Sequence, residues 1–117
     1  MEIFVNVLND KVTLVVIKGD FTIADINLFD SVVFPIFDKN ENNIVLNMAN
    51  LTFIDSFGIG KLFSMLDMAK LKGKHLYIMN IRENIKELFN TLKLLRYYSI
   101  IEPKDLKKRF RIRKNII

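Results

Sequence analysis

The chain has 117 residues, of which 50% are hydrophobic and 11% are aromatic, so it can bury a core and fold as one domain. It contains no cysteine and one histidine, His75, which excludes disulfides, thiolate chemistry and a histidine-rich metal site. No stretch approaches the roughly 18 consecutive apolar residues of a membrane span. Residues 1–7 lack the basic segment of a signal peptide. We therefore expect a cytoplasmic protein without metal or cofactor.

The net charge of +5 is concentrated near the C-terminus. Seven of the 18 basic residues lie at positions 104–114, where Asp105 is the one acid, and the remaining 11 basic and 12 acidic residues nearly balance. We therefore expect a nearly neutral domain at 1–103 and a basic tail at 104–117. Terminal charge runs are commonly solvated, and contact with nucleic acid or anionic lipid is the alternative. A further alternative is docking of the tail through Phe110, Ile112, Ile116 and Ile117.

The first third of the chain predicts a hairpin followed by a helix. Residues 3–8 and 12–17 are rich in β-forming side chains, and Asn9-Asp10 suits a turn between them. Thr22 or Asp25 can cap the helix that follows. The apolar residues of this helix have helical spacing: Ile26, Phe29, Val33 and Ile36/Phe37. Pro35 removes a backbone donor and is expected to kink it.

The rest of the domain alternates strands and helices. Residues 42–48, 75–79 and 97–101 are short apolar runs typical of strands, and residues 81–92 have helical spacing. A further helix near residue 59 carries its core stripe on Ile59, Leu62, Phe63, Leu66 and Ala69. The predicted order is β-β-α-β-α-β-α-β. This order indicates an α/β domain with a central mixed sheet packed by helices.

Ser56 lies where the strand ends and the next helix begins. The first backbone N–H groups of a helix lack internal partners and its dipole is positive there, so the Ser56 hydroxyl is expected to cap them. A phosphate would be favoured at the same place. Asp55 could orient the hydroxyl, and Gly58 allows close approach of neighbouring atoms. No nucleophile elbow, dinucleotide fingerprint or phosphate-loop motif is present, so we do not expect an enzyme.

The stretch "NIVLNMANLTFIDSFGIGKLF" resembles the signature of the STAS-domain family, in particular the bacterial anti-sigma-factor antagonists. The matching residues of its Asp-Ser-x-Gly element are Phe53, Ile54, Asp55, Ser56, Gly58, Ile59 and Gly60. The later "IRENIKELFNTLKL" also resembles the family, and the likeness covers residues 1–102. It implies a STAS-like fold in which Ser56 is the phosphoacceptor.

The resemblance also implies partners. The unphosphorylated protein would bind an anti-sigma factor that is a serine kinase, and phosphorylation of Ser56 would end binding until a serine phosphatase resets the switch. Two positions depart from the family pattern. Phe57 stands where a second Ser or Thr is common, and Thr22 stands where an aspartate often follows the first hairpin.

A second face of the helix after Ser56 suggests a docking surface. Exposed methionines suit adaptable binding, although apolar residues at helical spacing are more often core. We predict that Met65→Glu weakens partner binding without unfolding the domain. The rival function is a STAS-like scaffold or accessory subunit, of a signalling or transport complex, in which Ser56 is only a cap. The predicted partner-binding residues are Asp55, Ser56, Phe57, Gly58, Lys61, Met65 and Met68.

Overall fold

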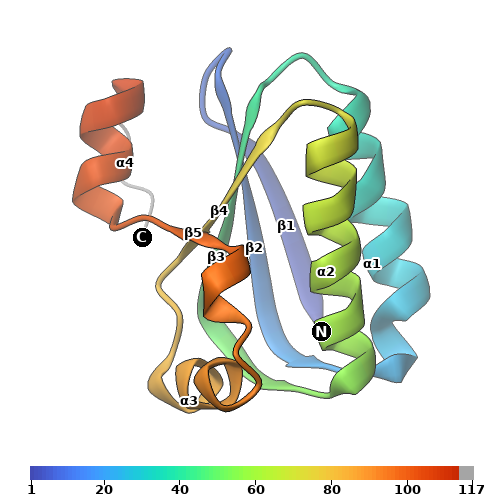
Figure 1. Ribbon diagram of the computed structural model, residues 1–117. Helices are drawn as coiled ribbons and strands as arrows, with labels where there is room; N and C mark the ends of the chain where they lie inside the picture. Colours follow the sequence, from blue (N-terminus) through green and yellow to red (C-terminus); the bar gives the residue numbers. More distant parts are fainter. Residues whose placement is uncertain (114–117) are drawn as a thin grey trace.

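The computed structural model describes residues 1–113 and shows a five-stranded sheet with helices on both faces (Figure 1). The strands and helices predicted from the sequence are present in the predicted order, and a fourth helix follows them. The elements are β1 (Glu2–Val7), β2 (Val12–Phe21), η1 (Ile23–Asp25), α1 (Ile26–Val33), η2 (Phe34–Asp38), β3 (Asn43–Ile54), α2 (Ser56–Leu71), β4 (His75–Met79), α3 (Glu83–Thr91), η3 (Leu95–Tyr97), β5 (Ser99–Ile100) and α4 (Pro103–Phe110), where η marks a 3-10 helix.

The strands lie in the sheet in the same order as in the chain. β1 pairs antiparallel with β2, whereas β2, β3, β4 and β5 are parallel neighbours. Each parallel pair needs a crossover connection, which α1, α2 and α3 provide. As a result the carboxyl ends of the parallel strands meet at one edge of the sheet, which is the lower edge in Figure 1.

The helix predicted to include Pro35 ends before it. α1 stops at Val33, and Pro35 occupies the first turn of the 3-10 helix η2 that follows. A proline is tolerated in a first turn because its missing N–H would have no partner there. In place of the kink expected at Pro35, the chain changes from the α-helix α1 to the 3-10 helix η2 after Val33.

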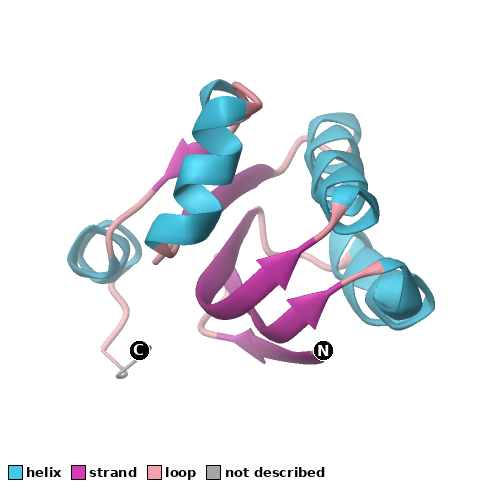
Figure 2. Ribbon diagram, turned by 90° about the horizontal axis from the view of Figure 1, so that it is seen from below, coloured by secondary structure: helices cyan, strands magenta, loops and turns pink. Residues whose placement is uncertain are grey.

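The main core lies between the sheet and the helices α1 and α2, which cover the same face (Figure 2). Phe21 of β2 stacks on Phe29 of α1 with ring centroids 4.9 Å apart, and both side chains are fully buried. Aromatic pairs of this kind contribute roughly 1 kcal/mol beyond the area that they bury. This packing fixes the end of β2 beside the start of α1. None of the helices within residues 1–113 is long and apolar enough to cross a membrane.

A second, smaller core lies on the other face of the sheet, under α4. Leu106 of α4 is fully buried and Ile112 is nearly so, against Val45 and Met79 of the sheet. The side-chain amide of Asn9 also donates a hydrogen bond of 2.9 Å to the carbonyl of Phe110.

The expectation of a solvated tail beginning at residue 104 is therefore corrected for residues 104–113. This segment is helical as far as Phe110 and packs on the sheet. It therefore agrees with the alternative in which the tail docks through Phe110 and Ile112. Lys114, Ile116 and Ile117 lie outside the described residues.

Candidate functional site

Asp55 holds together the elements at the lower edge of the sheet. It follows β3 directly, and one of its carboxylate oxygens accepts hydrogen bonds from the N–H groups of Phe57, at 2.9 Å, and Gly58, at 3.0 Å. The other oxygen accepts from the N–H of Ile23, at 3.1 Å, across from η1. Asp55 is thus the N-cap of α2 and also ties that helix to the segment after β2.

Ser56 is not the cap that the sequence predicted. The helix begins one residue earlier than expected, so Asp55 takes the capping position and Ser56 becomes the first helical residue. The Ser56 side chain is exposed, and its hydroxyl makes no hydrogen bond to any residue in the range 1–113. A hydroxyl without a structural bond at the start of a helix is available to an approaching protein.

Three exposed apolar side chains belong to the segments that meet at the start of α2, where Ser56 lies. Phe57 beside it is 50% exposed, and Phe53 at the end of β3 is 52% exposed. Ile23, whose N–H is bonded to Asp55, is 58% exposed. We call Ile23, Phe53, Ser56 and Phe57 the Ser56 surface. Exposed large apolar side chains on segments that meet at one edge of a domain are typical of a protein-docking site. Phe57 was predicted as a partner-binding residue, whereas Ile23 was not, and Phe53 was identified only as part of the family element.

Gly58 is buried and serves packing. A Cβ atom placed on it would lie 2.7 Å from Cγ1 of Ile54 and 2.9 Å from the carbonyl oxygen of Phe21. The first turn of α2 therefore approaches β2 and β3 more closely than any other residue type allows. Its predicted role in partner binding is limited to this support of the helix start.

Lys61 bridges two helices. Its ammonium lies 2.9 Å from a carboxylate oxygen of Asp30 in α1 and 5.8 Å from the centre of the Phe34 ring. The second carboxylate oxygen of Asp30 is buried and has no hydrogen-bond partner among the described residues. Lys61 is therefore engaged within the domain, and its contribution to the site is to hold α2 against α1.

The predicted methionine docking face is wrong at Met65. This side chain is fully buried in the main core, because α2 packs against the sheet on one side and against α1 and η2 on the other. Two buried sides leave a narrower exposed strip than the amphipathic pattern suggested. Met68 is half-buried and lines a shallow hollow beside Phe34 and Pro35.

Thr22, which departs from the family pattern, has a structural use. Its hydroxyl accepts from the N–H of Ala24, and the Asp25 carboxylate accepts from the N–H of Thr22 at 2.9 Å, which forms a capping box at η1. The hydrogen bond from the Thr22 N–H holds the pKa of Asp25 below its usual value. This box fixes the backbone that presents Ile23.

Replacing Asp55 with alanine is expected to destabilise the domain by about 2 kcal/mol, because three backbone N–H groups lose a charged acceptor. Asp55→Asn keeps one oxygen acceptor and is expected to cost roughly half as much. Chemical denaturation followed by circular dichroism measures both changes. Asp67→Ala, an exposed acid on the same helix, is the control and should change stability by less than about 0.5 kcal/mol. Equal losses of stability in the alanine variants at positions 55 and 67 would contradict the capping role of Asp55.

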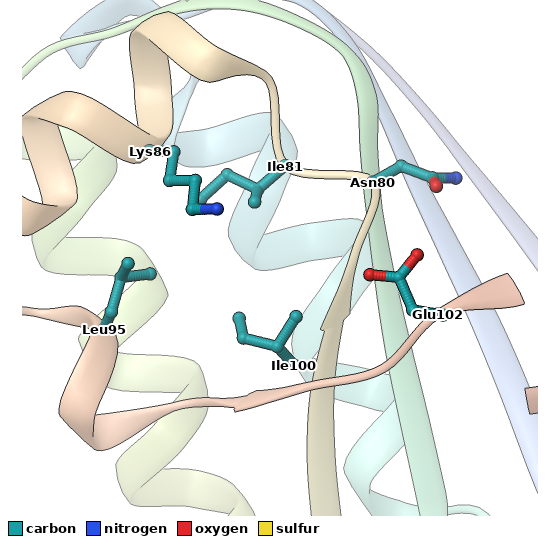
Figure 3. A pocket seen from close by; sticks show the side chains of 6 residues that line it. All are labelled: Asn80, Ile81, Lys86, Leu95, Ile100 and Glu102. Atoms are coloured by element: carbon teal, nitrogen blue, oxygen red, sulfur yellow. The ribbon is translucent and has the colours of Figure 1, made fainter. Parts of the chain in front are cut away.

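A separate cavity of about 250 Å³ lies at the carboxyl end of β4. Figure 3 shows the ammonium of Lys86 and the carboxylate of Glu102 on opposite sides of it, with apolar side chains between them. None of its lining residues is a predicted site residue. Within residues 1–113 no group of three acidic, histidine or cysteine side chains could hold a metal ion. The lining residues are Asn80, Ile81, Lys86, Leu95, Ile100 and Glu102.

Comparison with known proteins points to one family. Residues 5–105 match the STAS domain family. Among curated proteins, the anti-sigma-B factor antagonist of Staphylococcus epidermidis is 26% identical over 74 residues, which cover 63% of this chain and 68% of that protein. The anti-sigma-B factor antagonist of Staphylococcus aureus strain NCTC 8325 is 26% identical over 80 residues, covering 68% of this chain and 74% of that protein.

Two solved structures share the fold. The anti-sigma factor antagonist SpoIIAA in its unphosphorylated form aligns with a TM-score of 0.73 at 13% identity, over 94% of this chain and 98% of that one. The Bacillus cell fate determinant SpoIIAA in its phosphorylated form aligns with a TM-score of 0.72 at 14% identity, over 94% of this chain and 100% of that one. These likenesses confirm the predicted α/β architecture.

Proposed function

Because the chain belongs to the STAS domain family, we propose that it is an anti-sigma-factor antagonist whose binding is switched off by phosphorylation of Ser56. The observation that carries the proposal is the exposed Ser56 hydroxyl, which makes no hydrogen bond to the described residues and lies where segments with exposed apolar side chains meet. The names of the Staphylococcus relatives support the kind of partner, an anti-sigma factor. In this role the protein acts in the cytoplasm and is a ligand and a substrate, not a catalyst.

The Ser56 surface suits binding in the unphosphorylated state. Ile23, Phe53 and Phe57 together supply apolar area, and burying it against a partner is favourable by roughly 25 cal/mol per Å². A neutral hydroxyl among these side chains has a small desolvation cost when the partner offers one hydrogen bond. Asp55 and Gly58 lie behind this surface and hold the start of α2 in place.

Phosphorylation would act on the interface more than on the fold. The first free N–H groups of α2, those of Phe57 and Gly58, already donate to the Asp55 carboxylate. A phosphate on Ser56 therefore finds these donors occupied and a like charge beside it. Its charge of about −1.5 to −2 remains directed at the partner, where burial among apolar side chains is costly. The phosphate would thus weaken docking while the domain stays folded.

The switch needs two enzymes. A serine kinase, in the proposal the anti-sigma factor itself, transfers the γ-phosphoryl group of ATP to the Ser56 oxygen, which loses its proton, and ADP leaves. A serine phosphatase then uses water to return the hydroxyl and release inorganic phosphate. The chain contributes the acceptor hydroxyl and the docking surface to both reactions.

The test uses a purified anti-sigma factor kinase encoded in the same genome. Incubation with ATP is expected to add one phosphate, located on Ser56 by tandem mass spectrometry, and to release the complex. Ser56→Ala should remain bound in the presence of ATP. Ser56→Asp should weaken binding at least tenfold, about 1.4 kcal/mol, in calorimetry without ATP. Its melting temperature should change little, since the phosphate site is exposed.

Ser31→Asp is the matched control, because Ser31 is an exposed serine on α1 outside the Ser56 surface. It should bind as the unmodified protein does. Tight binding that ignores ATP and is unchanged in Ser56→Asp would overturn the switch. That result would favour the second candidate, a STAS-type scaffold, which is supported by Thr22 standing where the family often has an acid.

A further inference from the structure

Packing of α4 on the second core leaves its charged side chains on the solvent side of the helix. Leu106 and Phe110 face the sheet, so the opposite side of the helix is turned to solvent. Lys104, Lys108 and Arg111, at i, i+4 and i+7, are exposed on that side, and the half-buried Lys107 at i+3 borders it. We call Lys104, Lys107, Lys108 and Arg111 the basic face. It extends over roughly 10 Å at 1.5 Å per residue.

The cations of the basic face form no ion pairs with the described residues, although Glu102 lines a hollow with Lys104 and Lys107 and Asp105 lines another with Lys108. No residue of the basic face forms an ion pair with another residue in the range 1–113, whereas Lys61 and Lys72 elsewhere on the domain do. Asp105 is the one acid of α4 and lies off the line of the basic face. Arg109 is not counted, because its guanidinium lies over the Tyr77 ring. Four unpaired cations in one line, on a domain that is otherwise nearly neutral, form a local site for an extended anion.

The position of α4 separates it from the Ser56 surface. α4 packs on one face of the sheet, whereas α1 and α2 cover the other (Figure 2). α2 begins at Ser56, at its lower end in Figure 1, whereas α4 lies at the upper left, on the other side of the sheet. A partner on the basic face would therefore leave the Ser56 surface open.

We propose that the basic face binds the phosphate backbone of nucleic acid without reading its sequence. Nucleic acid carries a phosphate every few ångströms along each strand, so several lie opposite a 10 Å row of cations. An anionic membrane is the less suitable partner. Basic helices that bind membranes place apolar side chains beside their cations for insertion, but the apolar side chains of α4 are turned into the second core.

The test measures binding of fluorescein-labelled 20-nucleotide RNA and DNA strands, and of a 20-bp DNA duplex, by fluorescence anisotropy across salt concentrations. Four contacts predict a slope of log K against log salt of about −2.8 for single strands and about −3.6 for the duplex. The variant K104Q/K108Q/R111Q is expected to bind at least tenfold more weakly. Its single-strand slope should be shallower by about 2, because three contacts are lost.

The matched control is K39Q/K70Q/K93Q, which removes the same charge from exposed positions elsewhere and should bind within twofold of the parent. K104R/K108R keeps the charge and should also bind normally, and Ser56→Asp should not change the affinity for nucleic acid. Equal weakening by the two triple-glutamine variants would overturn the proposal. So would binding to vesicles containing anionic lipid in the absence of binding to any of the three nucleic acids.

Discussion

Met65→Glu is expected to unfold the domain. The Met65 side chain is fully buried in the main core, and Lys61, one turn earlier on α2, is already paired with Asp30 at 2.9 Å. Introducing a carboxylate there leaves a buried charge without a partner or forces the group to bind a proton, and apolar packing is lost as well. The expected cost is about 5 kcal/mol, a large share of the stability of a domain of this size.

The measurement is urea denaturation followed by circular dichroism, with Met68→Glu as the control. Met68 is half-buried at the edge of the same helix, where a glutamate can turn to solvent, so the expected loss is about 1 kcal/mol or less. If Met65→Glu instead stayed folded, melted cooperatively and bound the partner more weakly, Met65 would belong to the docking face predicted from the sequence.

Gly58→Ala is expected to destabilise the domain by about 3 kcal/mol. The new methyl group would lie 2.9 Å from the carbonyl oxygen of Phe21, which belongs to the sheet backbone and cannot turn away. The first turn of α2 must then move from the sheet, which strains packing around Ile54 and weakens the hydrogen bonds to Asp55. The gain of about 1 kcal/mol in helix propensity does not offset this.

Gly60→Ala provides the comparison, because position 60 lies two residues further along the same helix and a Cβ there has no neighbour within 4 Å. The free energy of unfolding of Gly60→Ala should rise by up to about 1 kcal/mol, from helix propensity alone. The difference between the two alanine variants is read from the same denaturation curves. A destabilised Gly60→Ala, or a neutral Gly58→Ala, would show that α2 does not meet the sheet as closely as described.

The sequence predicted the strands, the three crossover helices and their order, because alternating apolar patterns and turn residues report directly on local structure. It also predicted the junction at Ser56. It did not predict that Asp55 would cap α2, since Asp and Ser are both good N-caps and a shift of one residue leaves the pattern unchanged. The structure distinguishes them, because Asp55 accepts hydrogen bonds from the N–H groups of Phe57 and Gly58 and also from that of Ile23 in η1.

The errors on α2 and α4 have one physical origin. Local periodicity shows that a helix has an apolar side but does not show how many neighbours it will have. Met65 is buried because α1 lies beside α2, which no pattern within α2 can reveal. In α4, the high charge concealed Leu106 and Phe110, whose i, i+4 spacing after Pro103 was the available sign of a helix.

The short ladder between β4 and β5 has a consequence for motion on the hydrogen-exchange timescale. β5 pairs with β4 through two residues, and few apolar side chains hold α4 on the sheet. Segments with so few contacts open locally at a lower free energy than the whole domain unfolds. Amide protons of β5 and α4 should therefore exchange with solvent before those of β2 and β3, while the Ser56 surface keeps its shape.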